Sequence, residues 1–93
     1  MKTAKAIFFV WIEGEIIPSE NASRDLAMLN MFKIDMGALK FNYYPSDQTF
    51  SIVVEQLATN EFSAIGDAQN RIIDYQNKNA YCDSLTVYKY QRY

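Results

Sequence analysis

The stretch Thr49-Phe50-Ser51-Ile52-Val53-Val54-Glu55-Gln56-Leu57 decides the fold. Polar and apolar side chains alternate over the first half of this stretch. The residues that follow are apolar on both sides. Alternation of this kind is typical of a strand, and apolar residues on both sides indicate a strand in the interior of a sheet. The stretch therefore predicts a central strand, with Phe50, Ile52 and Val54 facing the core.

A second strand is predicted immediately before it, over residues 38–44. Its side chains fall into two alternating sets: Leu39, Phe41 and Tyr43 against Lys40, Asn42 and Tyr44. The residues between the two strands, Pro45-Ser46-Asp47-Gln48, have the composition of a turn. Two strands joined by so short a turn form an antiparallel hairpin.

Two further strands are predicted at the ends of the chain. The first covers Lys5 to Glu13 and has large apolar side chains on both sides, so it also lies inside the sheet. We expect Ile7, Phe9 and Trp11 to face away from the helices, although the opposite choice is nearly as plausible. The last strand covers Asp83 to Tyr90, with its two sides formed by Leu85 and Val87 and by Thr86, Tyr88 and Tyr90.

Two amphipathic helices are predicted between the strands. The first runs from about Glu20 to Met36, with Ser19 or Asn21 as its cap and Gly37 as its left-handed end. Its apolar face is predicted to comprise Ala22, Leu26, Leu29, Phe32 and Met36, widened by Met28 and Met31. The second begins after Thr59-Asn60 and ends at Asn77-Lys78-Asn79, with Phe62, Ile65, Ile72 and Ile73 on its apolar face. Its internal Gly66 suggests close packing on the sheet.

The order strand–helix–strand–strand–helix–strand predicts an α+β fold of the ferredoxin-like βαββαβ type. Each helix connects two strands through a right-handed crossover. The resulting four-stranded antiparallel sheet has the spatial order 4-1-3-2, with both helices on one face. The 93 residues form one domain, residues 1–93, because the chain is too short for a second core.

Composition excludes several classes of chemistry. The chain has no His, which removes Ser-His-Asp and Cys-His catalysis and His-ligated metals. The lone Cys82 forms no internal disulfide or Cys-based zinc site, and we interpret it as a small buried side chain. We therefore expect no metal and no cofactor. The net charge of −2 argues against a protein that binds nucleic-acid backbones.

The apolar run from Ala6 to Ile12 is interpreted as a buried strand. It is too short for a membrane span, ends in acidic residues and lacks the small-residue cleavage site of a signal peptide. We therefore expect a cytoplasmic protein with no membrane contact.

Because both helices cover one face, the other face of the sheet is left open in a single chain. This open face is predicted to carry an exposed apolar patch larger than monomers normally have. A second copy, packed sheet to sheet, is the simplest cover, because two-fold dimers are the commonest oligomers. The candidate pocket or interface residues are Phe9, Trp11, Glu13, Asn42, Val53, Glu55, Tyr88 and Tyr90.

The stretch from Gly37 to Gln56 resembles the hairpin of dimeric α+β barrel proteins, which include antibiotic-biosynthesis-monooxygenase-like and small stress-response domains. The shared features are a Gly after the first helix, a Tyr-rich strand, an Asp-containing turn and a strand ending in Glu. A helix with an aromatic residue in its first turn follows, here Phe62. The resemblance implies a homodimeric barrel whose cavity can hold a small aromatic or polyketide-like ligand. Some members are cofactor-free oxygenases, and only Trp11 could take the part of their Trp.

Four functions remain open at this point. The first is a homodimeric barrel with a binding or regulatory role, and the second is a cofactor-free enzyme of the same shape. In the enzyme, a carboxylate buried among aromatic rings would act as a base; in the simpler interpretation, Glu13 and Glu55 are solvated strand ends. The third is a single-stranded nucleic-acid module, opposed by the acidic charge. The fourth is a module that binds another protein through its Tyr-rich final strand.

Overall fold

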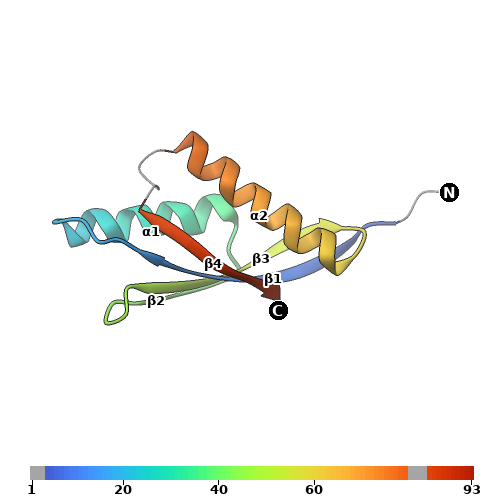
Figure 1. The fold of residues 1–93 in the computed structure, drawn as a ribbon, viewed down its shortest axis with the longest axis horizontal. Helices are drawn as coiled ribbons and strands as arrows, with labels where there is room; N and C mark the ends of the chain where they lie inside the picture. The colour runs from blue at the N-terminus through green and yellow to red at the C-terminus, as the bar shows by residue number, and fades with distance from the viewer. Residues whose placement is uncertain (1–3, 80–83) are drawn as a thin grey trace.

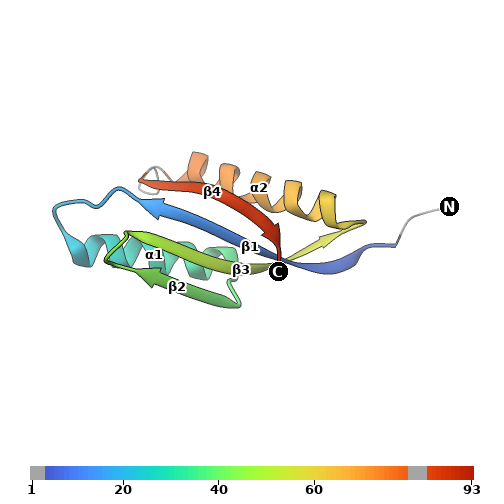
Figure 2. The same ribbon diagram turned by 60° about the horizontal axis from the view of Figure 1, so that its bottom comes forward.

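A computed structural model describes residues 4–79 and 84–93, and shows a four-stranded antiparallel sheet with two helices on one face (Figure 1). The strands lie side by side in the order β2-β3-β1-β4, with β1 and β3 in the middle (Figure 2). This is the predicted order, read from the opposite edge. The elements are β1 (Ala6–Ile16), α1 (Ala22–Met36), β2 (Lys40–Tyr44), β3 (Thr49–Ala58), α2 (Glu61–Lys78) and β4 (Leu85–Arg92).

The core lies between the helices and one face of the sheet. Phe50, Ile52 and Val54 of β3 are each 2% exposed or less, as predicted from their alternation. Val10 and Ile12 of β1 join them, so the odd-numbered side chains of β1 face away from the helices. The structure thus settles the choice that the sequence left open for this strand.

The helix ends follow the predicted capping chemistry. The Asn21 side chain accepts a hydrogen bond from the Arg24 amide at 3.1 Å at the start of α1. Gly37 ends that helix with φ 65°, in the left-handed region that glycine enters without steric cost. The Asn60 side chain accepts from the Ser63 amide at 2.8 Å at the start of α2. These local signals are readable from sequence because each involves residues three or four positions apart.

The faces of the two helices differ in part from the prediction. In α1, Leu29, Phe32 and Met36 are buried as expected, together with Met28, but Ala22, Leu26 and Met31 are exposed. In α2, the buried residues are Ala64, Ala68 and Ile72, whereas Phe62 is 88% exposed and Ile73 is 45% exposed. Ile72 and Ile65 of the predicted α2 face do pack, since Ile72 is 1% exposed and Ile65 lies against the core, whereas Phe62 and Ile73 were predicted wrongly.

The expectation that Gly66 packs closely on the sheet is wrong. A Cβ atom at this position would have no neighbour within 4 Å. The close approach of α2 to the sheet is made instead by the small side chains of Ala64 and Ala68, each 1% exposed.

Gly14 is the glycine that the packing requires. β1 continues through it to Ile16, beyond the predicted end at Glu13. A Cβ atom on Gly14 would lie 2.6 Å from the Thr86 carbonyl oxygen and 2.7 Å from the Phe50 ring. A glycine inside a strand often marks such a close approach or a β-bulge, and here it marks both.

The β-bulge changes which side chains of β4 face the helices. Glu13 pairs with Lys89, but the next residue, Gly14, pairs with Val87, so Tyr88 is an extra residue in β4. Beyond the bulge, Tyr90 pairs with the core residue Ile12 and packs against the core. The prediction that Tyr90 faces the same side as Tyr88 is therefore wrong, because strict alternation does not hold across a bulge.

Residues 80–83 include Cys82, so its predicted burial lies outside the described residues. Of the two helices in residues 4–79 and 84–93, neither has the length and apolar character needed to cross a membrane.

Candidate functional site

The open face of the sheet has two ends of different character. At one end, Ile7, Phe9 and Leu57 are 57%, 42% and 53% exposed. Ile7 and Leu57 are cross-strand partners, and Phe9 lies two residues from Ile7 on the same face of β1, opposite Glu55. These three exposed apolar side chains are therefore neighbours on the open face. At the other end, polar and aromatic side chains surround a pocket.

Between the two ends, Tyr93 lies over the middle of the open face. Its amide donates to the Phe9 carbonyl oxygen at 2.8 Å, and its ring stacks on Trp11 with a centroid separation of 5.9 Å. The Lys40 ammonium group donates a hydrogen bond to the Tyr93 hydroxyl. Trp11 and Lys40 are also the cross-strand partners of Val53, which is 2% exposed although no helix covers it.

The pocket has a volume of about 280 Å³ and lies beside the β2–β3 hairpin. Its wall is formed by β1, β4 and the hairpin, three segments that are distant in the sequence. Its lining residues are Trp11, Glu13, Tyr44, Asp47, Thr49, Phe50, Ser51 and Tyr88. The bulge places Tyr88 here, because it is the residue that β4 leaves without a partner on β1.

Two polar groups in this pocket stand out. The Trp11 indole N–H donates to Glu13 Oε1 at 2.7 Å, which fixes the orientation of that carboxylate. Ser51 is 3% exposed, and its Oγ has no hydrogen-bond partner. Buried hydroxyls are normally paired, since an unpaired one costs about 1–3 kcal/mol. The hydroxyl of Ser51 is therefore an unusual feature of this face.

Of the candidate residues, Trp11, Glu13 and Tyr88 line the pocket. Four others are placed on the open face but outside the pocket by their strand pairing: Phe9, Asn42, Val53 and Glu55. Asn42 is next to the pocket, as the cross-strand partner of Ser51, whereas Glu55 is at the apolar end.

Tyr90 belongs to neither region, because it packs against the core on the helix side. Burial there raises the pKa of its phenol, since the ionised form would lose hydration.

Five lining residues were not among the candidates: Tyr44, Asp47, Thr49, Phe50 and Ser51. Phe50 was predicted only as a core residue. Tyr44 and Ser51 were assigned to the correct face but not to a site. Asp47 and Thr49 were interpreted only as turn and strand residues. The available signal was Ser51, a small polar residue between Phe50 and Ile52 in an otherwise apolar strand.

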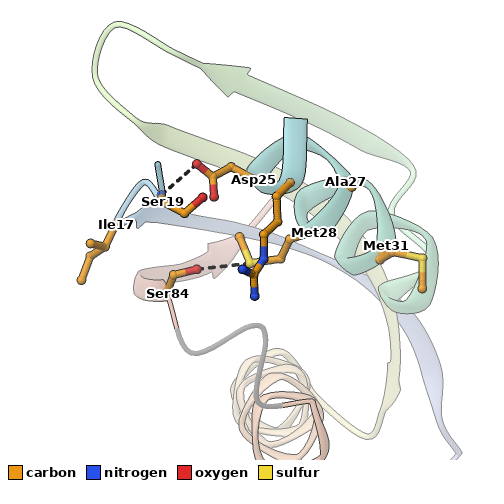
Figure 3. Close-up of a pocket in the computed structure, with 8 residues that line it drawn as sticks. Ile17, Ser19, Asp25, Ala27, Met28, Met31 and Ser84 are labelled. Carbon is orange, nitrogen blue, oxygen red and sulfur yellow. Dashed lines mark hydrogen bonds between the residues drawn. The ribbon is translucent and has the colours of Figure 1, made fainter. Parts of the chain in front are cut away.

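A second, larger pocket of about 500 Å³ lies between the start of α1 and Ser84 (Figure 3). The side chains of Asp25 and Ser84 in this pocket already have hydrogen-bond partners within the protein. Asp25 accepts from the Ser19 amide at 2.9 Å, and the Ser84 hydroxyl lies 3.2 Å from Met28 Sδ. These contacts are structural: they attach the β1–α1 connection and the start of β4 to α1.

No three His, Cys, Asp or Glu side chains among residues 4–79 and 84–93 come together as metal ligands. Comparisons with family models, with curated proteins and with solved structures gave no match to this chain.

Proposed function

We propose that the protein is a homodimeric binding domain of the dimeric α+β barrel type, in which two copies pack their open sheet faces together around the pocket. Its role is binding or regulation rather than catalysis. The observation that carries this proposal is the apolar end of the open face. Ile7, Phe9 and Leu57 are neighbouring exposed apolar side chains on a face without helices.

The size of the face is suited to a second copy. Strand spacing of about 4.8 Å and a rise of about 3.3 Å per residue give the four strands an area of roughly 500 Å² in projection. Side chains increase the accessible area beyond the projection, toward the about 800 Å² per partner of a standard interface. A second copy would therefore cover most of this face.

The charges on the face also favour a second copy over a strongly charged partner. Two-fold packing brings a surface against itself, so it has to be self-complementary. The open face carries the carboxylates of Glu13, Glu15 and Glu55 together with the ammonium groups of Lys40 and Lys89. Such a mixture of signs allows cross-dimer pairs, whereas a nucleic acid would require an excess of positive charge.

Size-exclusion chromatography with light scattering tests the proposal. The expected mass is twice the 10.8 kDa of one chain. Phe9→Lys is expected to give a folded monomer, because a buried charge opposes sheet packing while Glu55 opposite can pair with the new lysine. The matched control is Phe62→Lys, at an 88% exposed aromatic on α2, which should remain a dimer.

Circular dichroism on each variant separates loss of dimer from loss of fold. A monomeric wild-type protein across the micromolar range would overturn the proposal and favour a module that binds a different protein. Equal loss of dimer in both variants would show that the interface lies elsewhere.

A further inference from the structure

The pocket on the open face has a charge that selects its ligand. Two carboxylates, those of Glu13 and Asp47, are among its lining residues, and none of those residues is basic. Lys89 is the cross-strand partner of Glu13, but the ion pair found among residues 4–79 and 84–93 joins Arg92 to Glu61 instead. The negative charge in the pocket is therefore left without a cationic partner, which disfavours an anionic ligand.

The aromatic lining points in the same direction. Trp11, Tyr44 and Tyr88 contribute rings from three different strands to one small space. The face of an aromatic ring attracts a cation, and several such rings together are a common way to bind organic ammonium groups. Tyr44 and Tyr88 are about half exposed, at 49% and 55%, so both rings are accessible.

Ser51 supplies the observation that separates this pocket from an ordinary acidic surface. Its Oγ is buried at the floor of the sheet, between the cross-strand neighbours Glu13 and Asn42, and has no hydrogen-bond partner. A bound N–H or O–H donor, with a small shift of the two neighbours, would satisfy the hydroxyl. The penalty of the unpaired group would then be removed only in the bound state.

The hydrogen bond between Trp11 and Glu13 prepares the carboxylate for such a donor. Glu13 Oε1 accepts from the indole at 2.7 Å, while no described residue is bonded to Oε2. Because the side chain is already held in place, a ligand does not have to order it on binding.

We propose that this pocket binds a small organic cation, a primary ammonium compound, whose N–H groups are the donors that Ser51 and Glu13 can accept. Glu13 and Asp47 would contact its charge, Trp11, Tyr44 and Tyr88 would surround it, and Ser51 would accept a hydrogen bond. The volume of about 280 Å³ is near the lower end for ligand pockets, so the ligand is small. This inference gives a ligand class to the proposed binding function and rests on it.

Trp11 is the single tryptophan of the chain and lines the pocket, so its fluorescence reports binding directly. The probes are benzylammonium, benzyl alcohol and benzoate, which share a ring but differ in charge. Benzylammonium is expected to give a saturable change, with binding about tenfold weaker for the neutral alcohol. Benzoate should give no saturable change. Isothermal titration calorimetry gives the same comparison without an optical probe.

Variants identify the groups responsible. Glu13→Gln keeps an acceptor for the Trp11 indole but removes the charge, and should weaken benzylammonium binding about tenfold. The matched control is Glu15→Gln, on the same face of β1 but outside the pocket, which should bind as the wild type does. Ser51→Ala should also weaken binding.

Equal affinity for the three probes, or equal losses in Glu13→Gln and Glu15→Gln, would overturn the inference. Light scattering on the same samples keeps the two proposals separate. A dimer that does not bind benzylammonium would refute the ligand class alone. A monomer that binds it with the predicted selectivity would support the ligand class and refute the dimer.

Discussion

The two faces of the sheet show how similar burial can have different causes. On β3, Phe50, Ile52 and Val54 are buried by helices and by apolar side chains of β1. Ser51 and Val53 are just as inaccessible, at 3% and 2%, but they lie on the face without helices. The helix-covered face is complete within one chain, whereas the open face leaves a hydroxyl unpaired and apolar side chains exposed.

The largest expected difference between the faces concerns aromatic truncation. Phe50→Ala should lower the free energy of unfolding by about 3–5 kcal/mol, because it leaves a cavity against Phe32 and β1. Phe9→Ala should cost about 1 kcal/mol or less at low protein concentration, since the ring is 42% exposed. Urea unfolding measures both. Similar losses at the two positions would mean that the open face is as well packed as the core.

A second comparison uses two glycines. Gly14→Ala should destabilise by about 1–3 kcal/mol, because its Cβ would collide with the Thr86 carbonyl and the Phe50 ring. Gly66→Ala should instead stabilise by roughly 0.5–1 kcal/mol, since the site is an open helical position. Thermal or urea unfolding of the pair provides the test. A change of the same sign in both variants would contradict the packing described for Gly14.

A third comparison uses two serines, one on each side of the sheet. Without ligand, Ser51→Ala should raise the free energy of unfolding by about 1 kcal/mol, because it removes an unpaired buried hydroxyl. Ser84→Ala should not stabilise, since its hydroxyl contacts Met28 Sδ. Urea unfolding distinguishes the two. Destabilisation by Ser51→Ala would indicate that a water molecule or a second copy already satisfies the hydroxyl.

The smallest effect is expected for Tyr90, on the helix side of the sheet, whose contribution to the free energy of unfolding depends on pH. Burial raises the pKa of Tyr90 above its ordinary value of 10.0, so the folded protein favours the neutral phenol. This contribution to stability is complete below about pH 10 and is lost as the pH rises through the folded-state pKa. Tyr90→Phe should therefore reduce the alkaline loss of stability, measured by urea unfolding between pH 9 and about 11. Tyr88→Phe, on the open face, is the control, and an equal effect there would refute the burial of Tyr90 as the cause.

Part of the site could be predicted from sequence. Trp11 and Glu13 were expected on one face because alternation along β1 is regular as far as Glu13, and both line the pocket. Tyr90 was misplaced because the bulge at Tyr88 depends on how β4 pairs with β1. Asp47 was missed because a turn residue joins a pocket only through the position of the hairpin beside β1.

The sequence by itself determined the order of the elements, the helix ends at Asn60 and Gly37, the choice of Ser19 or Asn21 as the cap of α1, and the apolar series of β3. These features depend on residues a few positions apart, whose periodicity and hydrogen bonding are local. Only the tertiary structure decided which face of each helix packs, why Gly14 has no side chain, and that Ser51 is buried without a partner. Those features depend on contacts between distant segments, and a strand or helix pattern alone does not specify them.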